Sequence, residues 1–330
     1  MDISGNKHLL MIRLGIMGCG SIAHAMADAA LKTPNVTLYA VASRSYEKAS
    51  RFNASYHAEK IYGSYEALVQ DEHVDLVYIA TPHGLHHEHI KLCLDHKKHV
   101  LCEKAFTLNA QLALPLIELA REKGLFLMEA MWTRFIPSTH MIKDVLLSGL
   151  LGEILSVTID FGFNTPYDES SRLWNMALGG GALLDIGVYP LTMMHLLFGK
   201  PETMTSDVEF APNGVDKHEV VHLFYKHFEA ILKMSFTTNL EPNALVIEGS
   251  QDTLISHHFW MSQQVILKHA NEIFDLPFEL NGYEFELYES ALMIEAGNVE
   301  HPLMPHKTTI EMLQWMDEIR QSWGLKYAIE

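Results

Sequence analysis

The sequence predicts two domains of different class, an α/β domain over residues 11–128 followed by an α+β domain over residues 129–330. Three observations support this division. A chain of 330 residues is longer than one hydrophobic core usually organises. Its first part alternates short apolar runs with helical stretches, which is typical of a parallel sheet with helices on both faces. Its second part is rich in β-branched and aromatic residues between turn signals, which favours a large, mostly antiparallel sheet.

The first domain is predicted from apolar runs that alternate with segments of helical length and pattern. The runs expected to form strands are residues 12–17, 37–43, 76–80, 99–102 and 125–128. The helices are expected at residues 21–32, from about residue 46 onward, and at residues 87–95 and 108–123. Connections between parallel strands are almost always right-handed. The order therefore predicts one parallel sheet with helices on both of its faces.

The second domain is predicted as an open-faced sheet with one or two helices. The segments expected to form strands are residues 155–163, 220–224, 230–236 and 244–249. Long helical patterns are expected only at residues 183–198 and 308–323. The sequence leaves open whether this last helix packs back on the first domain. We expect the second domain to bind the substrate.

Composition excludes several classes of function. The formal net charge at pH 7 is −17, from 24 basic and 41 acidic residues, so neither nucleic acid nor an anionic membrane surface is an expected partner. We expect no membrane span, because no apolar run approaches the roughly 20 residues that one needs, and residues 1–10 lack the apolar core of a signal peptide. The widely spaced Cys19, Cys93 and Cys102 are typical of a reducing compartment. We therefore expect a cytoplasmic protein; whether residues 1–10 form a disordered extension stays open.

A glycine-rich turn follows the first predicted strand and opens the first predicted helix. Gly18 would allow the tight turn, Gly20 would let the main chain approach a pyrophosphate, and Ala23 would let the helix pack closely on the strand. The main-chain N–H groups of Ser21 and Ile22 would then face the phosphates at the positive end of the helix. This context predicts a Rossmann-type dinucleotide-binding domain.

The residues after the second predicted strand indicate which dinucleotide is bound. A carboxylate at this point would bond both ribose hydroxyls of NAD, whereas a cation would accept the additional phosphate of NADP. The chain has Ser43 and Arg44 here, with Lys48 one turn into the next helix. An arginine fork beside a hydroxyl suits a phosphate monoester. The pattern therefore favours NADP, with NAD as the alternative and a solvated Arg44 as the purely structural interpretation.

The order of motifs along nearly the whole chain resembles the Gfo/Idh/MocA oxidoreductases. Residues 80–86 resemble the A-T-P-x-x-x-H turn of that family, and residues 99–104 resemble its H-V-x-x-E-K segment. The resemblance implies that Thr81, Pro82, His86, Glu103 and Lys104 contact the cofactor. The family usually has proline, often in a cis peptide bond, where this chain has alanine at position 105. Alanine makes a cis bond far more costly, so the geometry of that loop stays open.

Two further segments narrow the resemblance to one branch of the family. Residues 129–135 and 179–190 are similar to the branch that holds the dimeric trans-dihydrodiol dehydrogenases and the NADP-dependent D-xylose 1-dehydrogenases. Many other members carry histidine where this chain has Tyr189. The resemblance to this branch implies a tyrosine acid/base, NADP as cofactor, and a homodimer formed through the open face of the second sheet.

Tyr189 is the candidate acid/base, and Lys104 is the candidate that assists it. A free tyrosine has a pKa of about 10, and a nearby ammonium group would lower that pKa by favouring the phenolate. Asp185 lies four residues before Tyr189, so both side chains are expected to face one pocket. Asp185 is therefore the third candidate catalytic residue, expected to position the substrate or to anchor Lys104. Glu103 is expected to orient Lys104 or the nicotinamide ribose. The structural alternatives are a core tyrosine, a surface lysine and a carboxylate at a helix end.

Four further residues are candidates for contacts with the substrate, namely Trp132, Arg134, Phe135 and Arg172. The two aromatic residues are equally interpretable as packing residues, and the two arginines as members of ion pairs. No metal site is expected, because the histidines between residues 83 and 89 lie across a turn and no cysteine or carboxylate set completes a site. Apart from His86, we expect these histidines to be solvated.

Three functions fit the sequence. The leading one is an NADP-dependent oxidoreductase that transfers a hydride between nicotinamide and a hydroxyl or carbonyl carbon of a sugar or cyclic diol. The second is an NAD-dependent glycosidase of the same fold, against which the pair of Ser43 and Arg44 argues. The third is a non-catalytic dinucleotide-binding regulator, which would be expected to lack the lysine or the acid/base; Lys104 and Tyr189 are both present.

Overall fold

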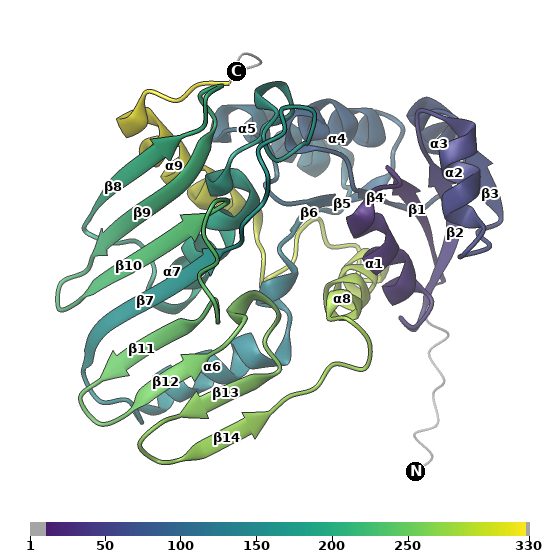
Figure 1. Ribbon diagram of the computed structural model, residues 1–330. Coiled ribbons are helices and arrows are strands. Elements are labelled where there is room, and N and C mark those ends of the chain that lie inside the picture. Colours follow the sequence, from purple (N-terminus) through teal and green to yellow (C-terminus); the bar gives the residue numbers. More distant parts are fainter. Residues whose placement is uncertain (1–10, 328–330) are drawn as a thin grey trace, which may run out of the picture.

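The computed structural model describes residues 11–327, and its first half is built on a six-stranded parallel sheet (Figure 1). The strand order is β3-β2-β1-β4-β5-β6, and every neighbouring pair is parallel. The strands are β1 (Ile12–Met17), β2 (Val36–Ala42), β3 (Lys60–Tyr62), β4 (Leu76–Ile79), β5 (His99–Glu103) and β6 (Leu127–Ala130). All residues of β4 and β6 are buried, as expected for strands covered on both faces. The predicted parallel sheet is confirmed, and the short β3 is an additional strand.

Five helices accompany this sheet and begin and end at recognisable signals. They are α1 (Ser21–Ala30), α2 (Tyr46–Asn53), α3 (Tyr65–Gln70), α4 (His86–Asp95) and α5 (Ala110–Lys123). The Ser45 and Asn109 side chains accept hydrogen bonds from main-chain N–H groups in the first turns of α2 and α5. Gly124 ends α5 in the left-handed conformation, at a φ of +64°. The helix α3 was not predicted.

The second half is built on an eight-stranded, mostly antiparallel sheet with the order β14-β13-β12-β11-β7-β10-β9-β8. Only β7 and β10 run parallel to each other. The strands are β7 (Ile154–Gly162), β8 (Thr203–Phe210), β9 (Asp216–Phe224), β10 (Glu229–Ser235), β11 (Leu245–Gly249), β12 (Thr253–Ser256), β13 (Gln264–Leu267) and β14 (Glu272–Asp275). The predicted α/β and α+β classes are therefore both confirmed.

Four helices belong to the second half: α6 (Pro137–Ser148), α7 (Val188–Phe198), α8 (Tyr283–Glu295) and α9 (His306–Trp323). In Figure 1, α6 and α7 lie behind the large sheet, and the face toward the viewer carries no helix. The other two helices reach the first half, where α8 packs against α1 and α9 packs against α5. The two halves are thus fastened by helices that come late in the chain.

The expectation of one or two helices in the second half was wrong. Helix α6 begins at Pro137 and ends before Gly149, which are the usual start and stop residues. Helix α8 buries Tyr283, Glu286, Leu287, Ser290, Ala291 and Ile294, at helical spacing. Two of the residue types on that buried face, Glu and Ser, are usually solvated. They interrupt the helical spacing of apolar residues, so the sequence pattern did not predict α8.

The predicted helix at residues 183–198 consists of two parts. Its first turn, Leu183–Gly187, is a π-helix, and α7 follows directly. Pro190 has no N–H to donate back along the helix, so regular α-helical hydrogen bonding is interrupted in this region. Asp216 of β9 caps the start, because its Oδ2 accepts a hydrogen bond of 2.7 Å from the Leu183 N–H. The residues that carry the candidate site are therefore anchored by the neighbouring sheet.

The segment Met176–Phe198 corrects the expectation that no apolar run has the length of a membrane span. It comprises 23 residues with a mean hydropathy of 1.4 in its best window, and 78% of that window is buried inside the molecule. Helices in the core of a folded domain have the same length and composition.

We predict that Asp216→Ala destabilises the fold. Asp216 is completely buried, and its removal leaves the Leu183 N–H without an acceptor, which costs about 1–3 kcal/mol. Urea unfolding should show this loss in the free energy of unfolding. The control Asp207→Ala removes an exposed carboxylate on β8 and should change that free energy by less than about 0.5 kcal/mol. Equal stability of the two variants would contradict the assignment of Asp216 as a helix cap.

Candidate active site

A cavity of about 690 Å³ lies between the two halves of the molecule. Most of its lining comes from loops at the carboxyl ends of the parallel strands, where open α/β sheets bind their ligands. The second half contributes Arg172, Asp185 and Tyr189. The lining from the first half is Gly18, Cys19, Gly20, Ser21, Ile22, Ser43, Arg44, Ser45, Lys48, Tyr65, Ala80, Thr81, Pro82, His83, Glu103 and Lys104.

The glycine turn presents main-chain groups to this cavity. Gly18 has a φ of +102°, and a Cβ there would come within 2.9 Å of the Ala80 carbonyl oxygen, so only glycine fits. A Cβ at Gly20 would meet no protein atom within 4 Å, because it would project into open space. Helix α1 begins directly after Gly20 and has no side-chain cap and no acidic residue in its first turn. Its free N–H groups fit the pyrophosphate of a dinucleotide.

Two cations lie at the end of the cavity where the sequence predicts that the adenosine binds. Arg44 follows β2 and Lys48 lies in the first turn of α2, and both are exposed. Neither makes an ion pair with any residue between 11 and 327. Ser45 caps α2, and Tyr65 of α3 lines the same end. Unpaired cations at the tip of the second strand fit the ribose phosphate of NADP.

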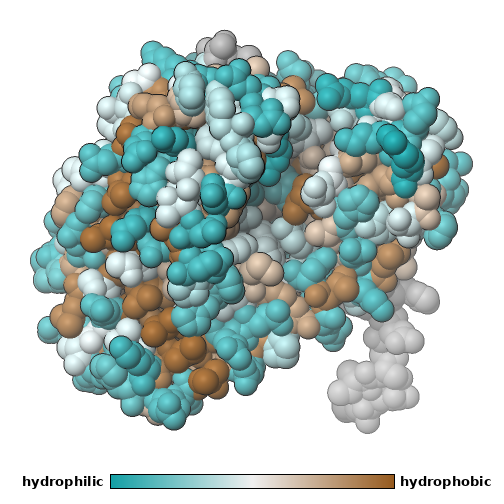
Figure 2. All heavy atoms as spheres, in the orientation of Figure 1, coloured by the Kyte–Doolittle hydropathy of each residue, from teal (hydrophilic) through white to brown (hydrophobic). Residues whose placement is uncertain are grey.

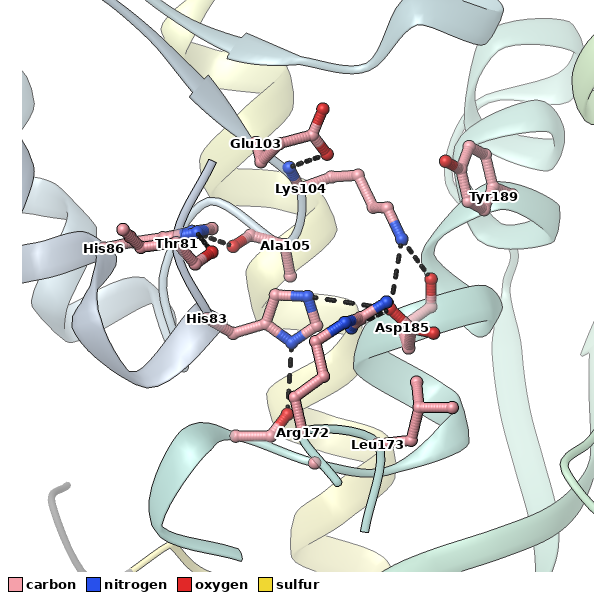
Figure 3. Close-up of polar contacts among 12 residues, drawn as sticks. Thr81, His83, His86, Glu103, Lys104, Ala105, Arg172, Leu173, Asp185 and Tyr189 are labelled. Carbon is pink, nitrogen blue, oxygen red and sulfur yellow. Dashed lines mark hydrogen bonds and ion pairs between the residues drawn. The ribbon is translucent and has the colours of Figure 1, made fainter. Parts of the chain in front are cut away.

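The opposite end of the cavity is dominated by charges around Asp185 (Figure 3). The Arg172 guanidinium lies 2.8 Å from Asp185 Oδ1, and the Lys104 ammonium lies 3.4 Å from the same oxygen. Lys104 Nζ also donates to the Asp185 carbonyl oxygen. Burial alone would favour the neutral carboxyl, but the Lys104 and Arg172 cations hold the pKa of Asp185 well below its usual value. The carboxylate in turn raises the pKa of Lys104 against the effect of burial.

Tyr189 faces Lys104 across the cavity. The Lys104 ammonium lies 4.8 Å from the centre of the tyrosine ring, within the range of a cation–π contact. The Tyr189 oxygen accepts a hydrogen bond of 3.2 Å from the Trp132 indole N–H. Burial raises the pKa of Tyr189, and the Lys104 ammonium partly offsets that rise. The tyrosine is therefore a neutral phenol at pH 7, which is the form that donates a proton.

Glu103 lies at the end of β5 and is 6% exposed. The Tyr78 hydroxyl donates a short hydrogen bond to Glu103 Oε1, and the Lys104 N–H donates to Glu103 Oε2 at 3.2 Å. Burial raises the pKa of this carboxyl. The Lys104 main chain is therefore tied to the Glu103 carboxyl, which also lines the cavity.

Two histidines lie in places that differ from those that the sequence suggested. His83 was expected to be solvated, but it is 6% exposed and lines the cavity. Its Nδ1 lies 3.1 Å from the Gly179 carbonyl oxygen and its Nε2 3.9 Å from Asp185 Oδ1. Burial lowers the pKa of His83 to about 3, so the ring is neutral. His83 stands at an unspecified position of the A-T-P-x-x-x-H motif, so the motif gave no signal for its place in the cavity.

The His86 side chain is fully buried and does not line the cavity, which corrects its expected place beside the cofactor. Its ring nitrogens lie 2.7 Å from the Thr81 carbonyl oxygen and 2.9 Å from the Ala105 carbonyl oxygen. It thus joins the turn of Thr81 and Pro82 to the loop behind Lys104 (Figure 3). The peptide bond between Lys104 and Ala105 is cis. The loop therefore has the cis bond that is often found in the family, although alanine stands in place of proline.

The four residues predicted to contact the substrate do not all line the cavity. Arg172 lines the cavity, with about half of its side chain exposed. Trp132, Arg134 and Phe135 are buried and do not line it. The Arg134 Nε–H donates to the Leu303 carbonyl oxygen at 2.6 Å. These three residues form a short helical turn and its end, beneath α8 and residues 301–304, and the Trp132 indole N–H reaches the oxygen of the cavity-lining Tyr189.

Histidine, cysteine and carboxylate groups do not gather into a metal site anywhere in the described part of the chain. The donors that the cavity does hold are already engaged, since Asp185 is shared by two cations.

Comparison with known proteins identifies the scaffold. Residues 12–131 match the family model described as "Oxidoreductase family, NAD-binding Rossmann fold", and residues 139–255 match the model of the "GFO/IDH/MocA C-terminal domain". The chain belongs to the Gfo/Idh/MocA oxidoreductase family. The resemblance seen in the motifs is thereby confirmed, and the glycine turn lies within the part of the chain that matches the NAD-binding Rossmann model.

The similarity to individual relatives extends over nearly the full chain. The trans-1,2-dihydrobenzene-1,2-diol dehydrogenase of Mus musculus is 30% identical, over 96% of this chain and 98% of that one. The D-xylose 1-dehydrogenase (NADP(+)) of Hypocrea jecorina is also 30% identical, over 98% and 94%. Among solved structures, KijD10, a 3-ketoreductase from Actinomadura kijaniata in complex with NADP and TDP-benzene, is 28% identical, with a TM-score of 0.86 and coverage of 94% and 97%. The two dehydrogenases have the activities of the branch that the motifs indicated.

Proposed function

We propose that this oxidoreductase uses NADP to transfer a hydride between nicotinamide and a hydroxyl or carbonyl carbon of a sugar or cyclic diol. The observation that carries the proposal is the pairing of Tyr189 with the Lys104 ammonium at one end of a cavity whose other end holds a free helix N-terminus and two unpaired cations. A dinucleotide that spans this cavity would bring its nicotinamide beside the tyrosine.

The choice of NADP rests on the cations at the adenosine end. Arg44 offers a planar fork of N–H groups that matches a phosphate monoester, and Lys48 adds a second positive charge. No carboxylate lines this end, so the group that would select NAD is absent from the lining. NADP is also the cofactor named for the D-xylose dehydrogenase and present in the KijD10 structure.

Bound nicotinamide would supply or accept the hydride, and the side chains of this chain manage the accompanying proton. In reduction, the Tyr189 phenol donates its proton to the carbonyl oxygen of the substrate as the new C–H bond forms. In oxidation, the phenolate accepts the proton from the substrate hydroxyl. Lys104 stabilises that phenolate and, because its ammonium points into the cavity, also donates a hydrogen bond to the reacting oxygen.

Asp185 has a different role, since its pKa is too low for proton transfer near neutral pH. Its carboxylate keeps Lys104 charged and aims the ammonium at Tyr189. Arg172 shares the carboxylate and has about half of its side chain exposed, so its remaining N–H groups are available to substrate hydroxyls. Glu103 holds the lysine main chain in place. The arrangement suits an oxygen-rich substrate.

We predict that Tyr189→Phe and Lys104→Met each lower kcat by about 10²–10⁴-fold, because each removes a group that moves or stabilises the transferred proton. The measurement follows the absorbance of reduced nicotinamide with NADP or NAD against aldopentoses, aldohexoses and trans-dihydrodiols. Tyr225→Phe is the matched control, since its hydroxyl donates to the Gly199 carbonyl oxygen far from the cavity. Full activity in Tyr189→Phe would refute the acid/base assignment.

We predict that Arg44→Ala raises the KM for NADP by at least about tenfold while the KM for NAD stays unchanged, because a charge-assisted hydrogen bond to the ribose phosphate is lost. The control Arg51→Ala removes the same side chain from the last turn of α2, outside the cavity. Initial rates over a range of both cofactors provide the test. Parallel changes for NADP and NAD would show that Arg44 does not read the phosphate.

We also propose a homodimer formed through the open face of the large sheet. Cross-strand pairing places one continuous row on this face across all eight strands, namely Thr205, His222, Ile231, Thr158, Val246, Ile255, Ile266 and Ile273. Most of the row is β-branched and apolar, and Ile273 is 57% exposed. Figure 2 shows apolar side chains over the lower strands of this face. A contiguous apolar patch of this kind favours a protein–protein contact.

We predict that Ile255→Arg, in the apolar half of that row, converts the protein to a monomer of 37.4 kDa, because an unpaired charge would be buried in the contact. Sedimentation velocity measures the mass. The control Leu147→Arg places the same charge at a leucine that is 75% exposed on α6, behind the sheet, and should leave the mass of the unaltered protein. A dimer that persists in both variants would place the interface elsewhere.

A further inference from the structure

We propose that Trp132 is a positioning residue that holds the Tyr189 oxygen through its indole N–H; this rests on the proposed acid/base role of Tyr189. The indole Nε1–H donates to the tyrosine oxygen at 3.2 Å. Trp132 is only 4% exposed and does not line the cavity. The indole therefore approaches the phenol from the protein side and leaves the side toward the substrate free.

Residues at the start of α8 fix the indole itself. The Tyr283 ring stacks on Trp132 with centroids 4.4 Å apart and an angle of 13° between the ring planes. Gly282 has a φ of +93°, and a Cβ there would lie 2.7 Å from the indole Cζ3, so a larger residue would displace the ring. One face and one edge of the indole are thus held by consecutive residues.

The same segment is tied to the helix of the cofactor site. The Asn281 side-chain amide donates to the Ala25 carbonyl oxygen of α1 at 2.9 Å, and α8 packs along α1. Helix α1 begins at the glycine turn. A continuous set of contacts therefore runs from the helix that would hold the pyrophosphate, through residues 281–283, to the indole and the tyrosine oxygen. The phenol oxygen is positioned relative to the cofactor site and not by α7 alone.

The chemistry of indole limits what Trp132 can do. Its N–H is a donor only, so it cannot take the tyrosine proton. A donor bonds the phenolate more strongly than the neutral phenol, and the indole N–H accordingly acts with Lys104 to lower the pKa that burial raises. The charged and titratable groups that act on Tyr189 from the elements around it are Glu103, Lys104, Arg172, Asp185 and Tyr283.

The hydrogen bond can be tested by NMR without cofactor or turnover. Protein labelled with ¹⁵N-tryptophan gives five indole N–H resonances, and Trp132→Phe identifies the one from Trp132. Tyr189→Phe removes the acceptor, so we expect this resonance to move upfield while the other four stay in place. The matched control is Ser206→Ala, which removes the acceptor of the Trp323 indole at 2.9 Å and should move only that resonance. An unchanged Trp132 resonance in Tyr189→Phe overturns the proposal.

Kinetics test the consequence for the acid/base. Trp132→Phe keeps an aromatic ring against Tyr283 and removes the donor, so kcat for oxidation should fall about tenfold at neutral pH. The rising limb of the kcat–pH profile should move up by about one unit, because the phenolate has lost a stabilising hydrogen bond. The KM for NADP should not change. Trp323→Phe removes an equivalent hydrogen bond on α9 and should leave kcat and the profile unaltered.

The outcomes separate the two proposals. A lower kcat without movement of the limb would mean that Trp132 only supports the fold, and would overturn its positioning role. A fully active Tyr189→Phe would instead overturn the acid/base assignment on which this inference depends. An inactive Tyr189→Phe together with an unmoved profile in Trp132→Phe would overturn the inference and leave the proposed function intact.

Discussion

The Asp185 carboxylate is the interaction on which the rest of the site depends, because it joins the two halves of the molecule. Lys104 and His83 reach it from the parallel-sheet half, and Arg172 reaches it from its own half. A buried carboxylate is tolerated only with such partners, and the loss of one partner leaves the others uncompensated. The same carboxylate therefore holds the two halves together at this point and keeps the lysine beside Tyr189 charged.

The charges that line the cavity contrast with the net charge of the whole molecule. The chain carries a formal charge of −17, yet the cavity is lined by four cations, Arg44, Lys48, Lys104 and Arg172, against the carboxyl groups of Glu103 and Asp185. The cations lie in two pairs at opposite ends. An elongated anionic ligand is attracted by such a cavity, whereas an acidic surface repels anions elsewhere. The distribution suits a dinucleotide phosphate at one end and a polar substrate at the other.

The sequence predicted the first half well because its signals are local. The glycine turn, the run of strands and the position of Arg44 each depend on residues close together in the chain. Prediction failed where distant contacts decide. Helix α8 was missed because Glu286 and Ser290 belong to its buried face. The two histidines differ in role because His83 meets Gly179, 96 residues away, while His86 is held between Thr81 and Ala105.

The same distinction separates the two ends of the cavity. The adenosine end is built from one βαβ unit and the turn after it, so its preference for a cofactor follows from a short stretch of sequence. The reacting end is assembled from residues far apart, with 81 positions between Lys104 and Asp185 and 57 between Trp132 and Tyr189. Their geometry is set by the way α8 and α9 fasten the second half to the first. Function depends on the residues of a site and not on the scaffold that carries it, and at this end those residues are brought together only by the packing of the two halves.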